Sequence, residues 1–500
     1  MSEIRVTFSG LISFVVGIGS LVTGLIFTLI VTRRLTPEEF GEWGLIGALT
    51  GYVLMFNPLI SYWNTREIAR GVDSGKTSLQ SSLLFSFGAI LVYLIIAKLV
   101  GSNVGVEFSV LFLAIMIIPV EFLKRSLTSI TLGFKPQAAE YGLVSFEITK
   151  IPLGLALIYF LDMGVEGVII TTTLASVSSI VILLIVARKK LQGKFQIKYV
   201  KKWAKLVWLP LYPRISSIFE RSDVTAFTII SGSLTGLAYW TAANSISHLV
   251  NHSGKINKAL YPKLLGGGKK EFFQENFVRV LYFAFPLTAM TIVFARPGLF
   301  LLNPLYEIAV LVVFALIPLT FLRTMQNVFS QALTGIEKVD TDENSTFMDY
   351  VKSKLFVIPT LVNIQRGVSL LSLVILLFIL IQYGSSELEL VISWGIIASV
   401  TQLPFTIYLG LMVRHEFHPK LNYSAIIKYL LATIIVFLII YVLMNEFLIY
   451  EKEIFVFLPN FLPFLVGSGA GYIGLTYLID PKTRKLVKLI ITEFKNRKQS

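Results

Sequence analysis

Four charged side chains stand inside an otherwise apolar stretch at 206–231: Arg214, Glu220, Arg221 and Asp223. A helix over this stretch would be about 39 Å long, enough to cross a bilayer with some tilt. An unshielded charge at the bilayer centre costs at least about 2.5–3.5 kcal/mol. The helix must therefore face protein or a water-filled cavity. Arginines in such a place could bind a phosphate or another anion.

Polar side chains recur on one face of this predicted helix and of the one predicted after it, at helical spacing. They are Arg214, Ser217, Arg221, Thr225 and Thr228, then Thr241, Asn244, His248, Asn251 and Lys255. One interpretation is a central cavity for an anionic, hydrogen-bonding substrate. The other is an ion-pair network, with Glu220 or Asp223 against Arg221 and Asp223 also against Lys255, that only holds helices together. Four charges in one span exceed what packing needs, which favours the cavity.

The composition places the chain in a membrane. Of its 500 residues 55% are hydrophobic and only 15% are charged, and the mean hydropathy is +0.74. Soluble domains carry about a quarter charged residues, so we expect a polytopic membrane protein with little room for a soluble domain. The chain has no cysteine, which excludes disulfides and thiolate chemistry.

Apolar windows of about 20 residues predict about fourteen transmembrane helices and an all-α fold. Prolines such as Pro58, Pro119 and Pro152 lie inside these windows, and we expect them to kink or break the helices. The windows are 9–32, 43–63, 79–100, 107–131, 141–161, 166–187, 206–231, 236–257, 275–295, 305–332, 355–382, 391–413, 425–447 and 454–478.

The basic residues predict the topology and the domain division. An even number of spans puts both termini on one side, and most of the 44 Lys and Arg residues then fall in loops on that side. This bias predicts cytoplasmic termini in a plasma-membrane protein, so the net charge of +14 faces anionic lipids and not nucleic acid. We predict an N-lobe, a basic linker, a C-lobe, two additional spans and a basic tail, at 1–187, 188–205, 206–413, 414–478 and 479–500.

Other predicted spans also carry charges. Glu147 and Lys150 stand three apart, close enough for an intrahelical ion pair, and Arg323 and Arg366 lie in later spans. Glu121 is a further membrane carboxylate. The sequence shows no nucleophile–base pair, and its four histidines have no carboxylate cluster with metal spacing. We therefore expect no catalytic residues, no metal site and no cofactor.

Four stretches together resemble the oligosaccharide-lipid flippases, or polysaccharide export proteins, of the multidrug/oligosaccharidyl-lipid/polysaccharide exporter superfamily. The first, RRLTPEEFGEW at 33–43, is similar to the family's R-x-L-G-P-E-E-[FY]-G-x-[YW], with Thr36 where glycine is usual. The others are Asp223 followed by GSLTGLAYW at 232–240, NPLY at 303–306, and LTG at 333–335 with Lys338 and Asp340.

The resemblance implies two six-helix lobes around a central cavity, here with two additional C-terminal helices. It also implies alternating access and movement of a polyprenyl- or dolichyl-linked oligosaccharide across the membrane, with no enzymatic activity. The expected partners are this lipid-linked oligosaccharide, the membrane lipids and glycosyltransferases of the same pathway, and we expect a monomer.

Such a cargo carries a phosphate or diphosphate, sugars and a prenyl chain. Arginine suits phosphate through its planar fork of donors, so we expect Arg214 and Arg221 to bind the headgroup phosphate. Further basic candidates are Lys150, Arg323 and Arg366, and the sugar-binding candidates are Asn244, His248 and Asn251. The carboxylates expected in ion pairs or in coupling to an ion are Glu220, Asp223, Glu147 and Glu121.

Two other functions remain open. A cation-coupled multidrug exporter of the same superfamily would favour a carboxylate-lined cavity, whereas the span at 9–32 has no acidic residue. A membrane glycosyltransferase using the same lipid donor would need a large outer loop with acidic or metal-binding residues, which this sequence lacks.

Overall fold

The computed structural model describes residues 6–205, 207–259, 264, 271–337, 339, 346–481 and 483–484. Lys338, Asp340 and most of the predicted tail at 479–500 lie outside these residues. Within the described ranges the fold is helical without strands, and each predicted apolar window coincides with helical segments. The all-α prediction is confirmed.

The chain forms two compact units, which are described separately. The first comprises Met1–Thr241 and Arg366–Leu390, and the second Ala242–Gln365 and Val391–Ser500. Three helices cross from one unit to the other: α12 (Leu234–Ser247), α18 (Lys354–Gln382) and α19 (Glu387–Phe417). The division into lobes that was expected from the basic linker stays a prediction.

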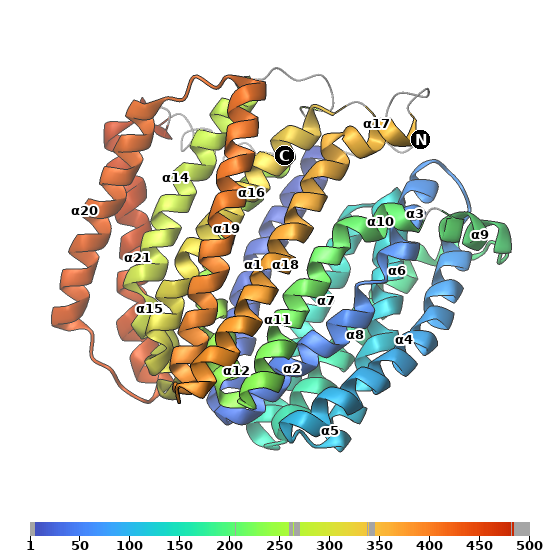
Figure 1. Cartoon of the computed structure of the whole chain (residues 1–500), viewed down its shortest axis with the longest axis horizontal. Coiled ribbons are helices and arrows are strands. Elements are labelled where there is room, and N and C mark those ends of the chain that lie inside the picture. The colour runs from blue at the N-terminus through green and yellow to red at the C-terminus, as the bar shows by residue number, and fades with distance from the viewer. Residues whose placement is uncertain are drawn as a thin grey trace, which may run out of the picture. The chain divides into compact units, whose positions relative to one another are not determined.

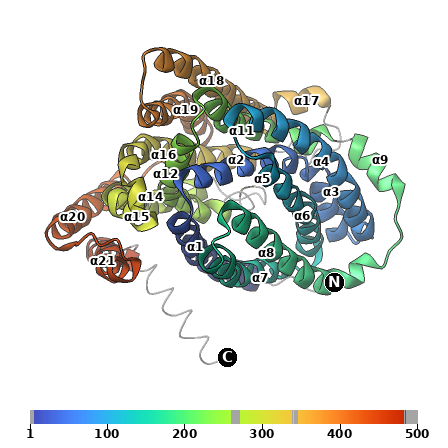
Figure 2. The same ribbon diagram turned by 90° about the horizontal axis from the view of Figure 1, so that it is seen from below.

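The other elements of the first unit run in chain order. They are α1 (Val6–Arg34), α2 (Pro37–Leu54), α3 (Pro58–Ala69), α4 (Gly75–Val104), α5 (Phe108–Leu113), η1 (Ala114–Met116), α6 (Ile117–Phe134), α7 (Gln137–Gly154), the π-helix η2 (Leu155–Phe160), α8 (Gly164–Ala187), η3 (Arg188–Leu191), α9 (Ile197–Lys205), α10 (Trp208–Leu211), η4 (Tyr212–Arg214) and α11 (Ile215–Ser231). Helix α7 packs against both α1 and α8, and α6 packs against α3, α4 and α8 (Figures 1 and 2).

The other elements of the second unit are also helical. They are η5 (His248–Ala259), α14 (Glu271–Val293), α15 (Ala295–Leu302), η6 (Pro304–Ala309), α16 (Val310–Gly335), α17 (Phe347–Lys352), α20 (Tyr423–Phe447) and α21 (Ile454–Ile479). Helix α14 packs against α16, α20 and η5.

The helices have the length and the surface of membrane spans. Among the described residues nine helices are long and apolar enough to cross a bilayer, and the bent pair α2–α3 makes a tenth. Helix α4 exposes an apolar stripe formed by Leu84, Leu91, Ile95 and Leu99, each more than 60% exposed. The serines in its first half, Ser78, Ser81, Ser82 and Ser86, are buried. Such a stripe would be an aggregation hazard in water but suits contact with lipid.

Proline breaks two of the predicted spans. The window at 43–63 is a pair of helices, α2 and α3, that meet at a bend of 58°, and Pro58 begins α3. The prediction of one long helix over 206–231 is wrong. Pro210 and Pro213 lack the N–H that an α-helix needs, so this stretch folds as α10, η4 and a shorter α11.

Two of the motifs form turns that contact each other in the first unit. Thr36 caps α2: its Oγ1 accepts from Glu39 N at 3.2 Å, and Glu39 Oε2 accepts from Thr36 N at 2.8 Å. Gly232 ends α11 with a left-handed φ of 66°. Thr235 Oγ1 then donates to Glu38 Oε1 at 3.0 Å. The two motifs are therefore parts of one helix-end contact.

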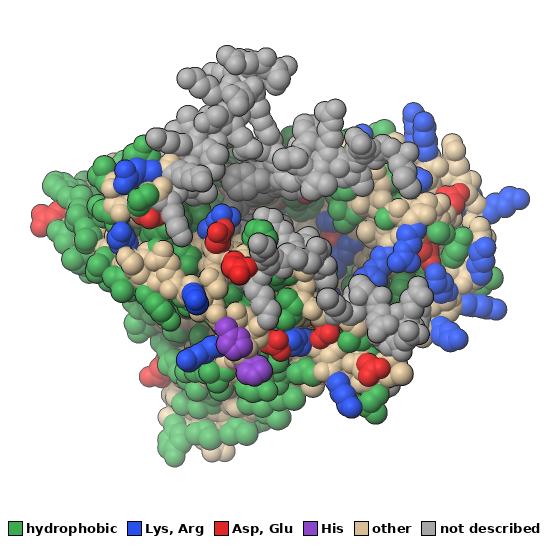
Figure 3. All heavy atoms as spheres, turned by 90° about the horizontal axis from the view of Figure 1, so that it is seen from above, with side chains coloured by type: hydrophobic (Ala, Val, Ile, Leu, Met, Phe, Trp, Pro, Cys, Tyr) green, Lys and Arg blue, Asp and Glu red, His purple; other side chains and the backbone are tan. Residues whose placement is uncertain are grey.

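Basic side chains gather at the end of the first unit that carries α9, toward the right of Figure 3. Trp203 is buried and anchors α9, and Lys202 pairs with Glu67 at 3.1 Å. The exposed members of this basic surface are Arg66, Arg70, Arg188, Lys189, Lys194, Lys198, Lys201, Lys202 and Lys205. Most of these residues belong to the segment at 188–205, whose role as a linker between lobes stays a prediction.

The last two helices are held in the second unit by tyrosines. Tyr282 of α14, Tyr429 of α20 and Tyr472 of α21 pack together, with ring centroids 4.9 and 5.2 Å from Tyr282. Tyr429 donates to Asp480 Oδ2 at 2.7 Å, and Tyr472 donates to the Tyr282 carbonyl at 2.7 Å. Thr483 also donates to Asp480, from N and Oγ1.

We expect Tyr429→Phe to destabilise the second unit by about 1–2 kcal/mol, because a buried carboxylate loses one of its donors. Tyr441→Phe is the matched control, since Tyr441 lies on the same helix and is 48% exposed. Thermal unfolding of the purified protein measures both changes. Equal melting temperatures for the two variants would contradict a stabilising role for the bond to Asp480.

Candidate functional site

A glycine-lined face of α2 allows α11 and α12 to approach closely in the first unit. Gly41, Gly44, Gly47 and Gly51 recur at helical spacing. A Cβ added at Gly41 would overlap the Leu234 carbonyl, and one at Gly44 would stand 3.0 Å from Thr241 Oγ1. This face of α2 therefore brings polar groups of the neighbouring helices against its backbone.

Arg221 reaches the same face from α11. Its Nη1 donates to the Gly47 carbonyl at 3.5 Å, and Gly47 is exposed. A Cβ at Gly51 would overlap the guanidinium, so glycine at this position makes the room for it. Among the described residues, Nε of Arg221 has no hydrogen-bond partner. The guanidinium thus lies half-buried against the backbone of α2, beside the exposed Gly47, with its Nε buried and unpaired.

Tyr52 fixes α2 against α11 next to this arginine. Its hydroxyl is 3.1 Å from Ser222 Oγ and 2.9 Å from Thr225 Oγ1. Thr225 is buried and also donates to the Arg221 carbonyl at 2.9 Å. The sequence pattern predicted that Thr225 lines a cavity. Instead Thr225 is buried between α2 and α11 and helps to hold these two helices together.

We expect Gly51→Ala to displace the Arg221 guanidinium at little cost in stability, because the overlapping atoms are the end of a flexible side chain. Gly47→Ala is the matched control: a Cβ there meets nothing within 4 Å, and both substitutions gain about 1 kcal/mol of helix propensity. Binding of inorganic pyrophosphate should weaken only in Gly51→Ala. Equal binding by both variants would show that the position of Arg221 is unimportant.

Arg366 and Glu220 form an ion pair within the first unit. Arg366 Nη2 lies 3.5 Å from Glu220 Oε1, and the side chains are 13% and 52% exposed. The two residues come from α18 and α11, so the sequence alone gives no reason to pair them. Glu220 is the accessible member of the pair.

Glu147 and Lys150 form the predicted intrahelical pair, in a buried position on α7. Glu147 Oε2 lies 2.7 Å from Lys150 Nζ, and Glu147 also accepts hydrogen bonds from Ser20 and Thr23 of α1, each at 2.7 Å. Lys150 Nζ lies 5.0 Å from the Phe146 ring centroid. The charge of Lys150 is thus balanced within the protein.

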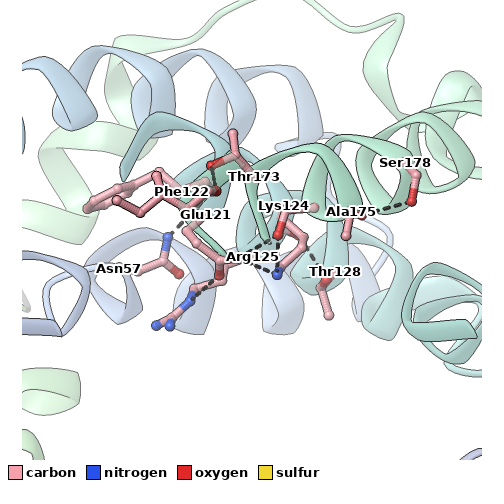
Figure 4. Close-up of polar contacts among 11 residues, drawn as sticks. Asn57, Glu121, Phe122, Lys124, Arg125, Thr128, Thr173, Ala175 and Ser178 are labelled. Carbon is pink, nitrogen blue, oxygen red and sulfur yellow. Dashed lines mark hydrogen bonds and ion pairs between the residues drawn. The ribbon is translucent and has the colours of Figure 1, made fainter. Parts of the chain in front are cut away.

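A half-buried carboxylate, Glu121, lies on α6 beside two cations that the sequence did not single out (Figure 4). Glu121 contacts Lys124 Nζ and lies 3.5 Å from Arg125 Nε, and Ser176 of α8 donates to it at 3.0 Å. The sequence signal for this group is that Lys124 and Arg125 follow Glu121 by three and four residues, a spacing that places them next to Glu121 on a helix. Arg125 is 45% exposed in its side chain.

The remaining predicted residues take various positions. In the first unit Arg214 is exposed just before α11 and Asp223 is buried. In the second unit His248 is exposed, and Asn244 and Arg323 are half-buried. The side chain of Lys255 lies outside the described part of the structure.

His248 and Asn251 lie together because η5 is a 3-10 helix, in which residues three apart share a face. Nδ1 of His248 is 3.0 Å from Nδ2 of Asn251, and Asn251 Oδ1 accepts from Thr324 Oγ1 at 3.4 Å. The described residues contain no group of three or more His, Cys, Asp or Glu arranged to hold a metal.

No protein-family model matches the chain, and no curated protein sequence matches it. Solved structures do. A structure of the lipid II flippase MurJ in an inward closed conformation aligns with a TM-score of 0.68 at 15% identity, over 95% of this chain and 99% of that one. A multidrug resistance MATE family transporter of the MOP superfamily aligns in its inward-facing conformation with a TM-score of 0.58 at 16% identity, over 80% of this chain and 94% of that one.

The chain has the fold of these membrane transporters. The outward-facing conformation of the MATE family transporter also aligns, with a TM-score of 0.53 at 17% identity, over 83% of this chain and 95% of that one. At these identities the likeness concerns the fold, and it agrees with the superfamily resemblance of the sequence motifs. The chain is an all-α, multi-pass membrane protein.

Proposed function

We propose that this protein flips a lipid-linked oligosaccharide, joined to a polyprenyl or dolichyl carrier through a phosphate or diphosphate, from the cytoplasmic to the outer leaflet by alternating access. The observation that carries the proposal is the Arg221 guanidinium, a half-buried cation that lies against the backbone of α2 in a transporter fold and whose Nε has no hydrogen-bond partner among the described residues. A phosphate is the part of such a cargo that needs this group.

The other predicted residues are proposed to contact different parts of the cargo or to form ion pairs. Arg214 is exposed and can contact the headgroup. Arg366 would break its ion pair with Glu220 in order to bind an anion. Arg323, Asn244, His248 and Asn251 offer donors to phosphate or sugar in the second unit. Glu220, Asp223 and Glu147 are proposed for ion pairing or coupling, and Lys150 for a supporting role beside Glu147.

The setting of this function is also proposed. We place the protein in the plasma membrane with both termini cytoplasmic, so that the basic surface around α9 faces anionic lipids. It would act as a monomer, without an enzymatic step, on a substrate made by glycosyltransferases of the same pathway. The exposed apolar helix faces can accommodate the prenyl chain in lipid.

The multidrug exporter is the second candidate. The observation in its favour is Glu147, a buried carboxylate with three donors in a fold shared with MATE transporters. Proteoliposomes that contain the full chain distinguish the two. Movement of a fluorescent polyprenyl-diphosphate oligosaccharide to the opposite leaflet, read by a membrane-impermeant glycosidase, is expected. Export of a cationic dye with no lipid movement would overturn the flippase proposal.

A further inference from the structure

The connection between α8 and α10 exposes lysines and large apolar side chains together. Residues 194–205 are here called the α9 segment, and Phe195 and Ile197 within it are 45% and 56% exposed. Both lie outside the predicted apolar windows, so contact of a transmembrane helix with lipid does not explain their exposure. The exposed lysines of the outer side of this segment are Lys194, Lys198, Lys201 and Lys205.

The inner side of the α9 segment is fixed to the first unit. Trp203 is buried. Lys202 pairs with the buried Glu67 of α3 at 3.1 Å. Just before the helix, Gln196 N donates to Oγ1 of the buried Thr77 of α4 at 3.0 Å. These contacts decide which side of the segment points away from the protein.

The outer side of α9 is basic and partly apolar. Ile197, Lys201 and Lys205 recur every four residues and are exposed, whereas Trp203 points into the protein. A charged face alone would be a solvated surface. Large apolar side chains are unfavourably placed in water, so the exposure of Phe195 and Ile197 is a second observation. It indicates a partner that has an apolar layer as well as negative charge.

The chain on both sides holds this segment at the membrane surface. The candidate membrane span before it is Gly164–Leu191, and the next apolar window begins at 206. Helix α9 has 9 residues and is therefore about 14 Å long. A connection this short stays near the lipid headgroups, whose electrostatic attraction extends about 10 Å at 0.1 M salt.

We propose that the α9 segment binds the anionic headgroups of the adjacent leaflet through its exposed lysines and inserts Phe195 and Ile197 between the lipids. The partner is a bilayer surface rich in acidic lipid. Helices with lysines on a polar face and large apolar side chains beside them bind such surfaces in this way. The inference rests on the proposed cytoplasmic position of the basic surface but not on the cargo.

The experiment measures which lipids surround residue 197 in the full chain. Because the sequence has no cysteine, Ile197→Cys introduces a single thiol, to which a bimane fluorophore is attached. The labelled chain is placed in phosphatidylcholine nanodiscs that contain a quencher lipid, either doxyl-phosphatidylglycerol or doxyl-phosphatidylcholine at the same mole fraction. We expect quenching by the phosphatidylglycerol form to be roughly threefold stronger or more.

Two comparisons test the role of charge. In the background Lys198→Gln, Lys201→Gln the two quencher lipids should become nearly equal, because the segment loses two cations. The matched control is Arg414→Gln, Lys420→Gln, which removes two exposed cations of the second unit and should leave the ratio unchanged. Salt at about 1 M shortens the screening length to about 3 Å and should also reduce the ratio. This measurement serves if the double lysine variant does not fold.

Three results would overturn the inference. Equal quenching by the two lipids at low salt would show that the segment has no preference for acidic headgroups. A fluorophore that is quenched by aqueous iodide and by neither lipid would place residue 197 in water. Protection from iodide that requires added polyglutamate would assign this face to an acidic protein.

The proposed function is tested separately. A protein that shows the lipid preference at residue 197 but moves no lipid-linked oligosaccharide would contradict the flippase proposal and keep this membrane-binding surface. Movement of the oligosaccharide without that lipid preference would contradict the surface and keep the flippase.

Discussion

Arg221→Ala should reduce translocation of a lipid-linked oligosaccharide by roughly 100-fold or more, because the phosphate loses two charge-assisted hydrogen bonds. The protein should remain folded. The substitution removes a half-buried cation whose Nε has no hydrogen-bond partner among the described residues, so little stabilisation is lost with it.

The measurement is the proteoliposome assay, with protein amount and monodispersity matched to the unmodified chain. Arg70→Ala controls for loss of a basic residue in the same unit and should transport normally. Arg214→Ala, at an exposed position, should have a smaller effect than Arg221→Ala. Full transport by Arg221→Ala would remove this residue from the binding site.

Glu147→Ala should destabilise the protein by about 3–5 kcal/mol, because it leaves the buried Lys150 ammonium without its carboxylate. It also leaves the Ser20 and Thr23 hydroxyls without their acceptor, which weakens the packing of α1 against α7. The double variant Glu147→Gln, Lys150→Met should recover most of the loss, since it removes both charges and keeps the volume.

Thermal unfolding and the yield of monodisperse protein measure this prediction. The matched control is Glu275→Ala, which breaks an ion pair of α14 whose atoms are 3.8 Å apart and whose side chains are 57% and 63% exposed. That exposed pair should contribute less than about 1 kcal/mol. If Glu147→Ala were as stable as Glu275→Ala, the buried pair would not be needed to hold α1.

Much of the fold follows from local sequence. Hydropathy locates the long apolar helices, and Pro58 marks the bend between α2 and α3, since these features act over a single turn or span. The break at Pro210 and Pro213 was missed because a window of about 20 residues averages over a local interruption. The pair Glu147–Lys150 was predictable for the same local reason, as its members lie one helical turn apart.

The rest of the site depends on which helices become neighbours. Arg366 meets Glu220 across a separation of 146 residues, and Arg221 meets Gly51 across 170. Spacing along one helix says nothing of such contacts. Arg125 illustrates the limit: its distance of four from Glu121 is visible in the sequence, but its hydrogen bond to Leu54 is not.

The 3-10 segment η5 gives the chain after α12 an adjustable length. It contains 12 residues, and a 3-10 helix rises about 2.0 Å per residue where an α-helix rises about 1.5 Å. Rewinding all of it into α-helix would shorten it by about 6 Å without breaking the coil. It would also offset His248 and Asn251 by about 60° around the helix axis, because three residues turn through about 300° in an α-helix and 360° in a 3-10 helix. Axial travel would therefore change the alignment of this polar pair.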